Sequence, residues 1–292
     1  MESGCKARTT RLKRFNTFVP KLPSALGTGT LMRPLNCEVV ETVRHTPHIS
    51  TLFLEPTPEG IPHPGQFVMV WVRGTDEVPM AVSHFEQGRL GITVQQVGTA
   101  TRALCDMHRG DGLGIRGYYG NGFTLAKRNA LLIAGGLGIA PLAYLYTRLV
   151  ENGCNPTVCV GARRREELIL LEELDGCEPV VATDDGSCGI SGTVVDALRN
   201  VELEQFERIY CCGPEGMMAK VHSLCKRAGV LSRVEFSLHR YFKCGIGVCG
   251  ACCIDPLGLR VCKEGPVFSG EVLDGPEFGH YKRDGAGRKV VV

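Results

Sequence analysis

The sequence has little net charge, few aromatic residues and no long apolar run. Lysine and arginine total 33 against 31 for aspartate and glutamate, so the chain lacks the single-sign field that nucleic acid binding usually needs. The longest apolar stretch, Ala130–Ala134, runs into glycines and is far shorter than the roughly 20 residues of a membrane-spanning helix. No apolar signal segment follows the basic residues near the N-terminus. We therefore expect a cytoplasmic protein that binds neither nucleic acid nor membrane.

Cysteine and glycine, in contrast, are abundant, at 15 and 37 residues. Hydrophobic residues make up 43% and charged residues 22% of the 292 residues, which is typical of a globular chain of about two domains with room for a small third module. Because no secretory signal is present, we expect the cysteines to serve as thiols or metal ligands and not as disulfides.

The first two thirds of the chain divide into a β-rich and an alternating part. Short β-rich runs with Pro, Gly and Asp between them predict an antiparallel barrel with one helix over 101–107, the strands covering 37–43, 49–54, 66–72, 90–97 and 112–116. After Gly122 strands alternate with helices, which predicts a parallel sheet with strands over 130–134, 157–161, 178–183 and 208–212 and helices over 141–151, 166–173 and 215–228.

The predicted fold class is thus α/β plus all-β, with a small cysteine-rich module near the C-terminus. We expect a flexible N-terminal extension over 1–31, a barrel over 32–125, an α/β domain over 126–232, a cysteine-rich domain over 233–275 and a tail over 276–292. The extension has no periodicity and fits either a transit peptide or residues upstream of a true start at Met32.

The strongest chemical motif is a cluster of cysteines with the spacing C-x4-C-x2-C and a later fourth cysteine, at Cys244, Cys249, Cys252 and Cys262. This is the plant-type ferredoxin spacing for a 2Fe-2S cluster, and the interspersed glycines allow a loop to turn its N–H groups toward the sulfurs. Structural zinc and unliganded thiols are the alternatives, although zinc sites usually carry two C-x2-C pairs. Cys253 is expected to stay unliganded because adjacent residues of an extended loop point in opposite directions.

A second motif predicts a dinucleotide site. The buried run 131–134 ends in Gly135, Gly136 and Gly138, and Pro141 follows in the first turn of the next helix, whose N-terminus suits a pyrophosphate. Two further loops at strand ends, around Asp184 and over Cys212-Gly213-Pro214, would lie on the same edge of a parallel sheet. Arg163–Arg165 could recognise the 2′-phosphate of NADPH, but a solvated basic turn is the simpler interpretation.

Two segments of the barrel are candidates for holding a flavin. The first is Pro79, Met80, Ala81, Val82 and Ser83, and the second is Gly98, Thr99, Ala100 and Thr101 at the start of the predicted helix, where N–H groups and the two threonine hydroxyls could bind phosphate. No residue has the setting of a catalytic acid or base, because His84, His222 and His239 are isolated in the sequence.

Together these motifs resemble the ferredoxin-NADP reductase superfamily, and within it the electron-transfer subunits of dihydroorotate dehydrogenase B, especially archaeal ones. The resemblance runs from about residue 32 to 271 and is most specific over 244–268. It implies an oxidoreductase subunit that binds FAD, a 2Fe-2S cluster and NAD. It further implies a partner catalytic subunit with FMN, in a heterotetramer, that oxidises dihydroorotate for pyrimidine biosynthesis.

The resemblance also assigns roles and shows one departure. Residues 79–83 would line the isoalloxazine, 98–101 the FAD phosphates and 135–141 the NAD pyrophosphate, with Cys212 near the nicotinamide. The family usually has Arg before Pro79 and Ser at 81, whereas this chain has Val78 and Ala81, and Arg102 is the candidate replacement for the lost phosphate partner. The same layout fits a subunit of a cytosolic hydrogenase or a ferredoxin-linked reductase, and a zinc-stabilised scaffold is the non-enzymatic alternative.

Overall fold

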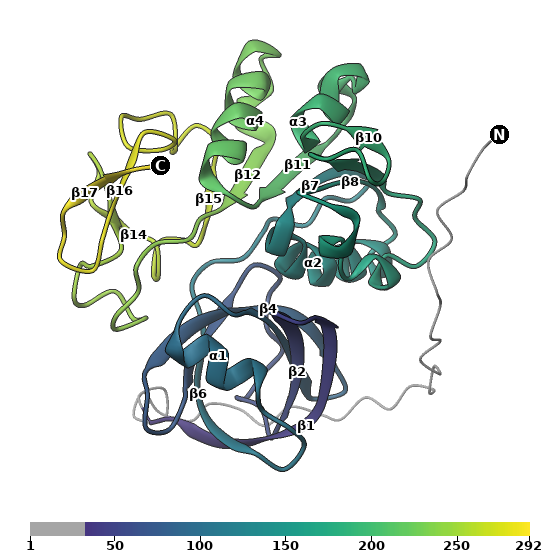
Figure 1. Ribbon diagram of the computed structural model, residues 1–292. Helices are drawn as coiled ribbons and strands as arrows, with labels where there is room; N and C mark the ends of the chain where they lie inside the picture. The colour runs from purple at the N-terminus through teal and green to yellow at the C-terminus, as the bar shows by residue number, and fades with distance from the viewer. Residues whose placement is uncertain (1–32) are drawn as a thin grey trace.

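The computed structural model describes residues 33–292 and consists of a barrel, an open sheet with helices and a C-terminal module (Figure 1). The predicted N-terminal extension over 1–31 lies outside the described residues. Within the described part of the chain, no helix is both long and apolar enough to cross a membrane.

The barrel is closed and antiparallel, with the strand order β1-β2-β5-β4-β3-β6. Its strands are β1 Leu35–Thr46, β2 Ile49–Glu55, β3 Phe67–Trp71, β4 Glu77–Glu86, β5 Arg89–Gln95 and β6 Gly112–Tyr119, and α1 Thr99–Cys105 follows β5. Aliphatic side chains such as Leu52, Val70 and Ile92 fill the interior and are fully buried. Because successive side chains of a strand point to opposite faces, the residues between these interior ones lie on the outer face of the barrel.

The second part is a seven-stranded sheet in the order β10-β9-β8-β7-β11-β12-β15, parallel except for β15. Its elements are β7 Asn129–Gly135, α2 Ile139–Glu151, β8 Asn155–Ala162, β9 Val180–Thr183, β10 Ile190–Ser191, α3 Val194–Ala197, β11 Arg208–Cys212, α4 Glu215–Arg227, β12 Val234–Ser237 and β15 Val267–Ser269. Since β12 and β15 come from the cysteine-rich part of the sequence, that part is joined to the sheet by backbone pairing.

The remaining C-terminal residues form two small hairpins. They are β13 Cys253–Ile254 with β14 Leu259–Arg260, and β16 Tyr281–Arg283 with β17 Lys289–Val291. Asp255 joins the two hairpins, because its carboxylate accepts hydrogen bonds from the Tyr281 hydroxyl at 2.8 Å and from Arg283 at 2.7 Å. The predicted tail over 276–292 therefore contains a hairpin packed on the cysteine-rich module.

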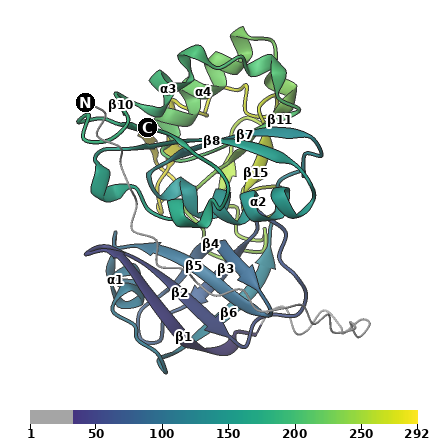
Figure 2. The same cartoon turned by 90° about the vertical axis from the view of Figure 1, so that its right-hand side faces the viewer.

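Helix α2 lies between the sheet and the barrel (Figure 2). Tyr144 of α2 belongs to the barrel's buried cluster, and its hydroxyl donates to the Pro62 carbonyl at 2.8 Å. Phe123, directly after the barrel, is fully buried against Tyr210 of β11, with ring centroids 5.4 Å apart. These contacts fix the barrel and the sheet against each other.

Three predicted elements differ from the structure. The predicted helix over 166–173 is wrong: two 3-10 turns, Arg165–Glu167 and Leu171–Glu173, take its place because Leu170 adopts a left-handed φ of 58° between them. The barrel has a sixth strand, β4, which the five predicted runs omitted. The helix predicted over 101–107 begins two residues earlier, at Thr99.

Candidate functional site

The predicted cluster ligands lie around one loop whose backbone N–H groups point at sulfur. The N–H of Gly247 donates to Cys262 Sγ at 3.1 Å, and those of Val248 and Cys249 donate to Cys244 Sγ at 3.3 and 3.5 Å. The N–H of Cys262 donates to Cys252 Sγ at 3.5 Å. Donors aimed at sulfur stabilise thiolate ligands and tune the reduction potential of an iron–sulfur cluster.

Glycines make this loop possible. Gly245, Gly247 and Gly250 all have φ between 72° and 77°, a region that other residues rarely adopt. A Cβ on Gly247 would lie 2.6 Å from the Lys263 side chain, so the loop has no room for one there. The glycine spacing seen in the sequence therefore has the structural role that was predicted for it.

Two of the predicted ligand thiols have pKa values shifted in opposite directions. Burial raises the pKa of Cys244, but hydrogen bonds from the backbone N–H groups of the loop outweigh it and lower that pKa to about 6. Burial, reinforced by Cys252, raises the pKa of Cys262 to about 12. Within residues 33–292 no group of three or more His, Cys, Asp and Glu side chains surrounds a single-ion position. The four-cysteine ligand set thus stays a prediction, supported by the N–H groups aimed at three of its four sulfurs.

The cysteine loop packs directly on the barrel. Arg116 of β6 donates to the Cys244 carbonyl at 3.3 Å while its Nε donates to Glu77 of β4 at 2.7 Å. A Cβ on Gly245 would lie 2.6 Å from Met69 Cγ. Met69 of β3 is paired in register with Pro79 of β4, the first residue of the predicted flavin segment. The predicted cluster site and the predicted flavin site are therefore one strand apart.

Two of the predicted nucleotide loops touch each other. A Cβ on Gly138 would lie 2.1 Å from the Cys212 carbonyl oxygen, and one on Gly213 would lie 2.8 Å from the Met217 side chain. β7 and β11 are adjacent and parallel, so both loops leave the same edge of the sheet. Burial raises the pKa of Cys212 to about 12, partly offset by a hydrogen bond with Ser237, so the Cys212 thiol stays protonated.

Gly136 and Pro141 lie where the dinucleotide motif predicts them. Gly136 has a φ of 51° with no atom near the position of a Cβ, which leaves open space at the turn. Pro141 is the third residue of α2 and is buried.

The third loop follows β9, two strands away from β7. The Asp184 N–H donates to the Ala162 carbonyl at 3.1 Å, and the Asp184 side chain is exposed. In the neighbouring basic turn, Arg163 and Arg164 both form ion pairs with Glu167, at 2.9 and 3.4 Å. This pairing favours a solvated basic turn over a site for the 2′-phosphate of NADPH.

The two predicted flavin segments lie on neighbouring parts of the barrel. Pro79–Ser83 belongs to β4, and Gly98–Thr101 lies at the start of α1. Thr101 Oγ1 accepts hydrogen bonds from the N–H groups of Val97 and Gly98, both at 2.9 Å, and donates to the Gly98 carbonyl. Its hydroxyl therefore holds the shape of the loop, which differs from the expectation that it would bind phosphate.

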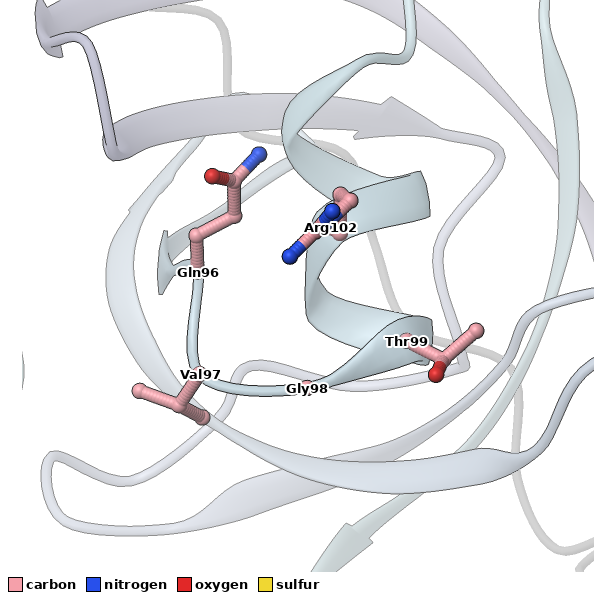
Figure 3. Close-up of a pocket in the computed structure, with 5 residues that line it drawn as sticks. All are labelled: Gln96, Val97, Gly98, Thr99 and Arg102. Carbon is pink, nitrogen blue, oxygen red and sulfur yellow. The ribbon is translucent and has the colours of Figure 1, made fainter.

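A cavity of about 400 Å³ opens beside this loop (Figure 3). It is lined by Gln96, Val97, Gly98, Thr99 and Arg102. Arg102 is exposed on α1, and its guanidinium points toward the side of the loop that carries Gln96, while Thr99 lies at the start of the helix (Figure 3). A phosphate of a dinucleotide fits this chemistry, because the lining of the cavity includes a cation and a hydroxyl.

Two family models match the chain. One is the iron–sulfur cluster binding domain of dihydroorotate dehydrogenase B, over residues 239–274, and the other is the oxidoreductase NAD-binding domain, over residues 132–223. A protein of Methanocella arvoryzae, described as the probable electron transfer subunit of dihydroorotate dehydrogenase B (NAD(+)), is 49% identical over 259 residues, covering 88% of this chain and 99% of that protein. The chain belongs to this family.

Other members and a solved structure agree with the assignment. The Archaeoglobus fulgidus subunit of the same description is 42% identical over 235 residues, 80% of this chain and 97% of the relative. An NADH-dependent reduced ferredoxin-NADP oxidoreductase, solved in a study of flavin-based electron bifurcation, matches with a TM-score of 0.72 and 30% identity over 80% of this chain and 88% of that one. A flavohemoglobin with bound FAD and heme shares the fold, with a TM-score of 0.59 and 17% identity over 70% of this chain and 59% of that one.

Some side chains that connect the candidate sites were not predicted from the sequence. Arg240 is buried and pairs with two glutamates, Glu215 beside the Cys212 loop at 2.7 Å and Glu277 of the C-terminal module at 3.0 Å, whose side chains are 8% and 2% exposed. The Arg116–Glu77 pair ties the cysteine loop to β4 in the same way. No local pattern marks such residues, because their partners are 25 to 128 positions away in the sequence.

Proposed function

We propose that this chain passes electrons from a partner dihydroorotate dehydrogenase through a 2Fe-2S cluster and FAD to NAD⁺ in pyrimidine biosynthesis. One observation carries the proposal: the Gly245 turn of the cysteine loop packs on Met69, and Met69 is paired with Pro79 of the flavin segment. An electron leaving the cluster therefore has a short route to the flavin.

The cofactors divide the chemistry. The cluster exchanges single electrons, NAD⁺ accepts a hydride, and a flavin mediates between the two because it handles both one and two electrons. The chain's own residues bind and orient these groups, and none of the described side chains is assigned as the acid or base for dihydroorotate oxidation. The partner's active site, with FMN, would oxidise dihydroorotate to orotate.

Each cofactor has a proposed binding segment. Cys244, Cys249, Cys252 and Cys262 hold the cluster, and Pro79–Ser83 line the flavin ring. Thr99, the N–H groups beside it and Arg102 bind the FAD phosphates. The Gly135–Pro141 turn binds the NAD pyrophosphate, with Asp184 and the Cys212–Pro214 loop completing the site.

Compartment and assembly belong to the same proposal. We place the protein in the cytoplasm, as half of a heterotetramer with two copies of each subunit. None of the cysteines within residues 33–292 forms a disulfide, which fits a reducing compartment.

The test is co-expression with candidate catalytic subunits, followed by anaerobic purification and analysis of iron, sulfide and flavin. A complex that contains FAD and two irons per chain, and that reduces NAD⁺ with dihydroorotate, supports the proposal. A chain that lacks both flavin and iron would support the scaffold alternative instead.

A second function has one observation in its favour, the likeness to the ferredoxin-NADP oxidoreductase. It predicts that reduced ferredoxin, and not dihydroorotate, serves as the electron donor. The same purified complex, offered each donor in turn, separates the two functions.

A further inference from the structure

A continuous line of hydroxyl groups crosses the outer face of the barrel and ends at the flavin segment. Thr93 Oγ1 donates to Ser83 Oγ at 2.8 Å, and Thr51 Oγ1 lies 2.9 Å from Thr93 Oγ1. His45 Nε2 lies 2.8 Å from Thr51 Oγ1. We call the three hydroxyl groups of Thr51, Thr93 and Ser83 the hydroxyl relay.

The hydroxyl relay is shielded from water. Thr51, Thr93 and Ser83 are 3%, 5% and 5% exposed, so a proton on Ser83 cannot be replaced directly from bulk solvent. Three adjacent strands, β2, β5 and β4, supply one hydroxyl each. Because β4 has a bulge between Val82 and His84, Ser83 is its extra residue. Bulges re-aim side chains and are common beside active sites.

His45 and Glu172 connect the Thr51 end of the hydroxyl relay to solvent. His45 Nδ1 lies 3.9 Å from Glu172, a spacing that a water molecule can bridge, and the Glu172 side chain is 52% exposed. Burial lowers the pKa of His45, opposed by the charge of Glu172. A neutral imidazole gives a proton from one nitrogen while it receives one at the other, which suits a relay position.

The proposed function requires such a path. Two electrons arrive from the cluster without protons, whereas a hydride, two electrons and one proton, leaves for NAD⁺. One proton per turnover must therefore reach the flavin from elsewhere. This inference rests on the proposed function, since it assumes that the flavin ring lies against Pro79–Ser83.

We propose that the hydroxyl relay carries this proton from His45 to the bound flavin. The proton leaves His45 Nε2 for Thr51, each hydroxyl passes its own proton to the next, and Ser83 gives its proton to the flavin. Glu172 and solvent then return a proton to His45 Nδ1. Together with two electrons from the cluster, this proton would supply the hydride that a bound flavin transfers to NAD⁺.

The experiment is stopped-flow reduction of the FAD-loaded, cluster-loaded chain by dithionite, in H₂O and in D₂O. Dithionite supplies electrons without hydride, so each flavin reduced must take a proton. The flavin and cluster absorbances are followed separately. The variants are Thr93→Val, which keeps the side-chain shape and removes the hydroxyl, Thr93→Ser, which restores it, and His45→Gln. Thr42→Val is the matched control, because the Thr42 hydroxyl donates to the Met107 carbonyl in the same barrel, outside the relay.

The expected result is specific to the flavin. Thr93→Val and His45→Gln slow flavin reduction by about tenfold or more, a usual size for losing a proton donor, while cluster reduction keeps its wild-type rate. Thr93→Ser and Thr42→Val react like wild type, and wild-type flavin reduction is slower in D₂O. The relay would be overturned if Thr93→Val and His45→Gln both reduced the flavin at the wild-type rate, or if the wild-type rate were the same in H₂O and D₂O. Either result would leave the proposed function intact.

Two outcomes cover a loss of flavin. If Thr93→Val alone loses FAD, the flavin reduction rate of His45→Gln tests the relay instead, because His45 lies at the end of the relay that is far from the flavin segment. If the wild-type chain binds no FAD, the proposed function fails and the relay fails with it.

Discussion

Replacing Gly138 by alanine should separate the two loops of the proposed nicotinamide site. The new Cβ would lie 2.1 Å from the Cys212 carbonyl oxygen, 2.4 Å from its carbon and 2.7 Å from the Gly213 nitrogen. All three atoms belong to the backbone, so no side-chain rotation relieves the clash. Ordinary contact begins at 3.4 Å, so the loops must part by about 1.3 Å, the difference between 3.4 and 2.1 Å.

The expected costs follow from this displacement. Overpacking of this kind destabilises a fold by about 1–3 kcal/mol. A misplacement of about 1 Å at a reacting centre can slow the chemistry roughly 100-fold. Gly138→Ala should therefore unfold at lower urea concentration and transfer hydride from NADH to FAD far more slowly than wild type.

Gly216→Ala is the matched control. Gly216 is the second residue of α4, and no atom lies within 4 Å of the position that its Cβ would take. Alanine favours a helix over glycine by up to about 1 kcal/mol, so stability should stay equal or rise. The reasoning is refuted if Gly138→Ala keeps wild-type stability, NADH affinity and hydride-transfer rate.

Four further changes test other parts of the account. Arg102→Ala should purify with less FAD, and full flavin content would exclude a phosphate contact for this residue. Cys252→Ser should lose iron on metal analysis whereas Cys253→Ser keeps it, and equal iron in both would contradict the ligand assignment. Arg240→Met should lower the free energy of unfolding by about 3–5 kcal/mol in urea, since it leaves two buried carboxylates without their partner, and a loss below about 1 kcal/mol would mean that these carboxylates are readily protonated or solvated. The hydrogen bond from Arg260 lowers the pKa of Glu264 from 4.5 to about 2. The Arg260–Glu264 pair therefore stabilises the fold fully above pH 4.5, and this stabilisation is lost as the pH falls through about 2. Glu264→Gln should flatten that part of the pH dependence of urea unfolding, and an unchanged profile would remove the ion pair from the explanation.

The local conformation of the glycine-rich motifs was predicted well, because it depends on residues that are consecutive in the sequence. The glycines around Cys249 do adopt positive φ values, and the Gly135–Pro141 turn does join a buried strand to a helix. The helix over 166–173 failed for an equally local reason, the left-handed Leu170, which an apolar run of leucine and isoleucine does not reveal.

Long-range features could not be predicted in this way. Strand β4 was missed because Pro79 lacks a backbone donor and weakens the strand signal of its segment. Thr51 and Thr93 are 42 residues apart, and only the strand register places their hydroxyls within 2.9 Å. Sequence alone gives no register for a barrel closed by such distant pairings, so the hydroxyl relay was invisible without the fold.

The most direct test of the account follows electrons from dihydroorotate through this chain in the assembled complex. Rapid-freeze EPR of the wild-type complex, mixed with dihydroorotate and NAD⁺, should show a reduced 2Fe-2S signal before NADH accumulates. With Cys252→Ser in place of the wild-type chain, dihydroorotate should still reduce an artificial dye at the partner subunit but yield no NADH. NADH formation at the wild-type rate by the complex with iron-free Cys252→Ser would contradict the central claim that electrons reach NAD⁺ through the cluster.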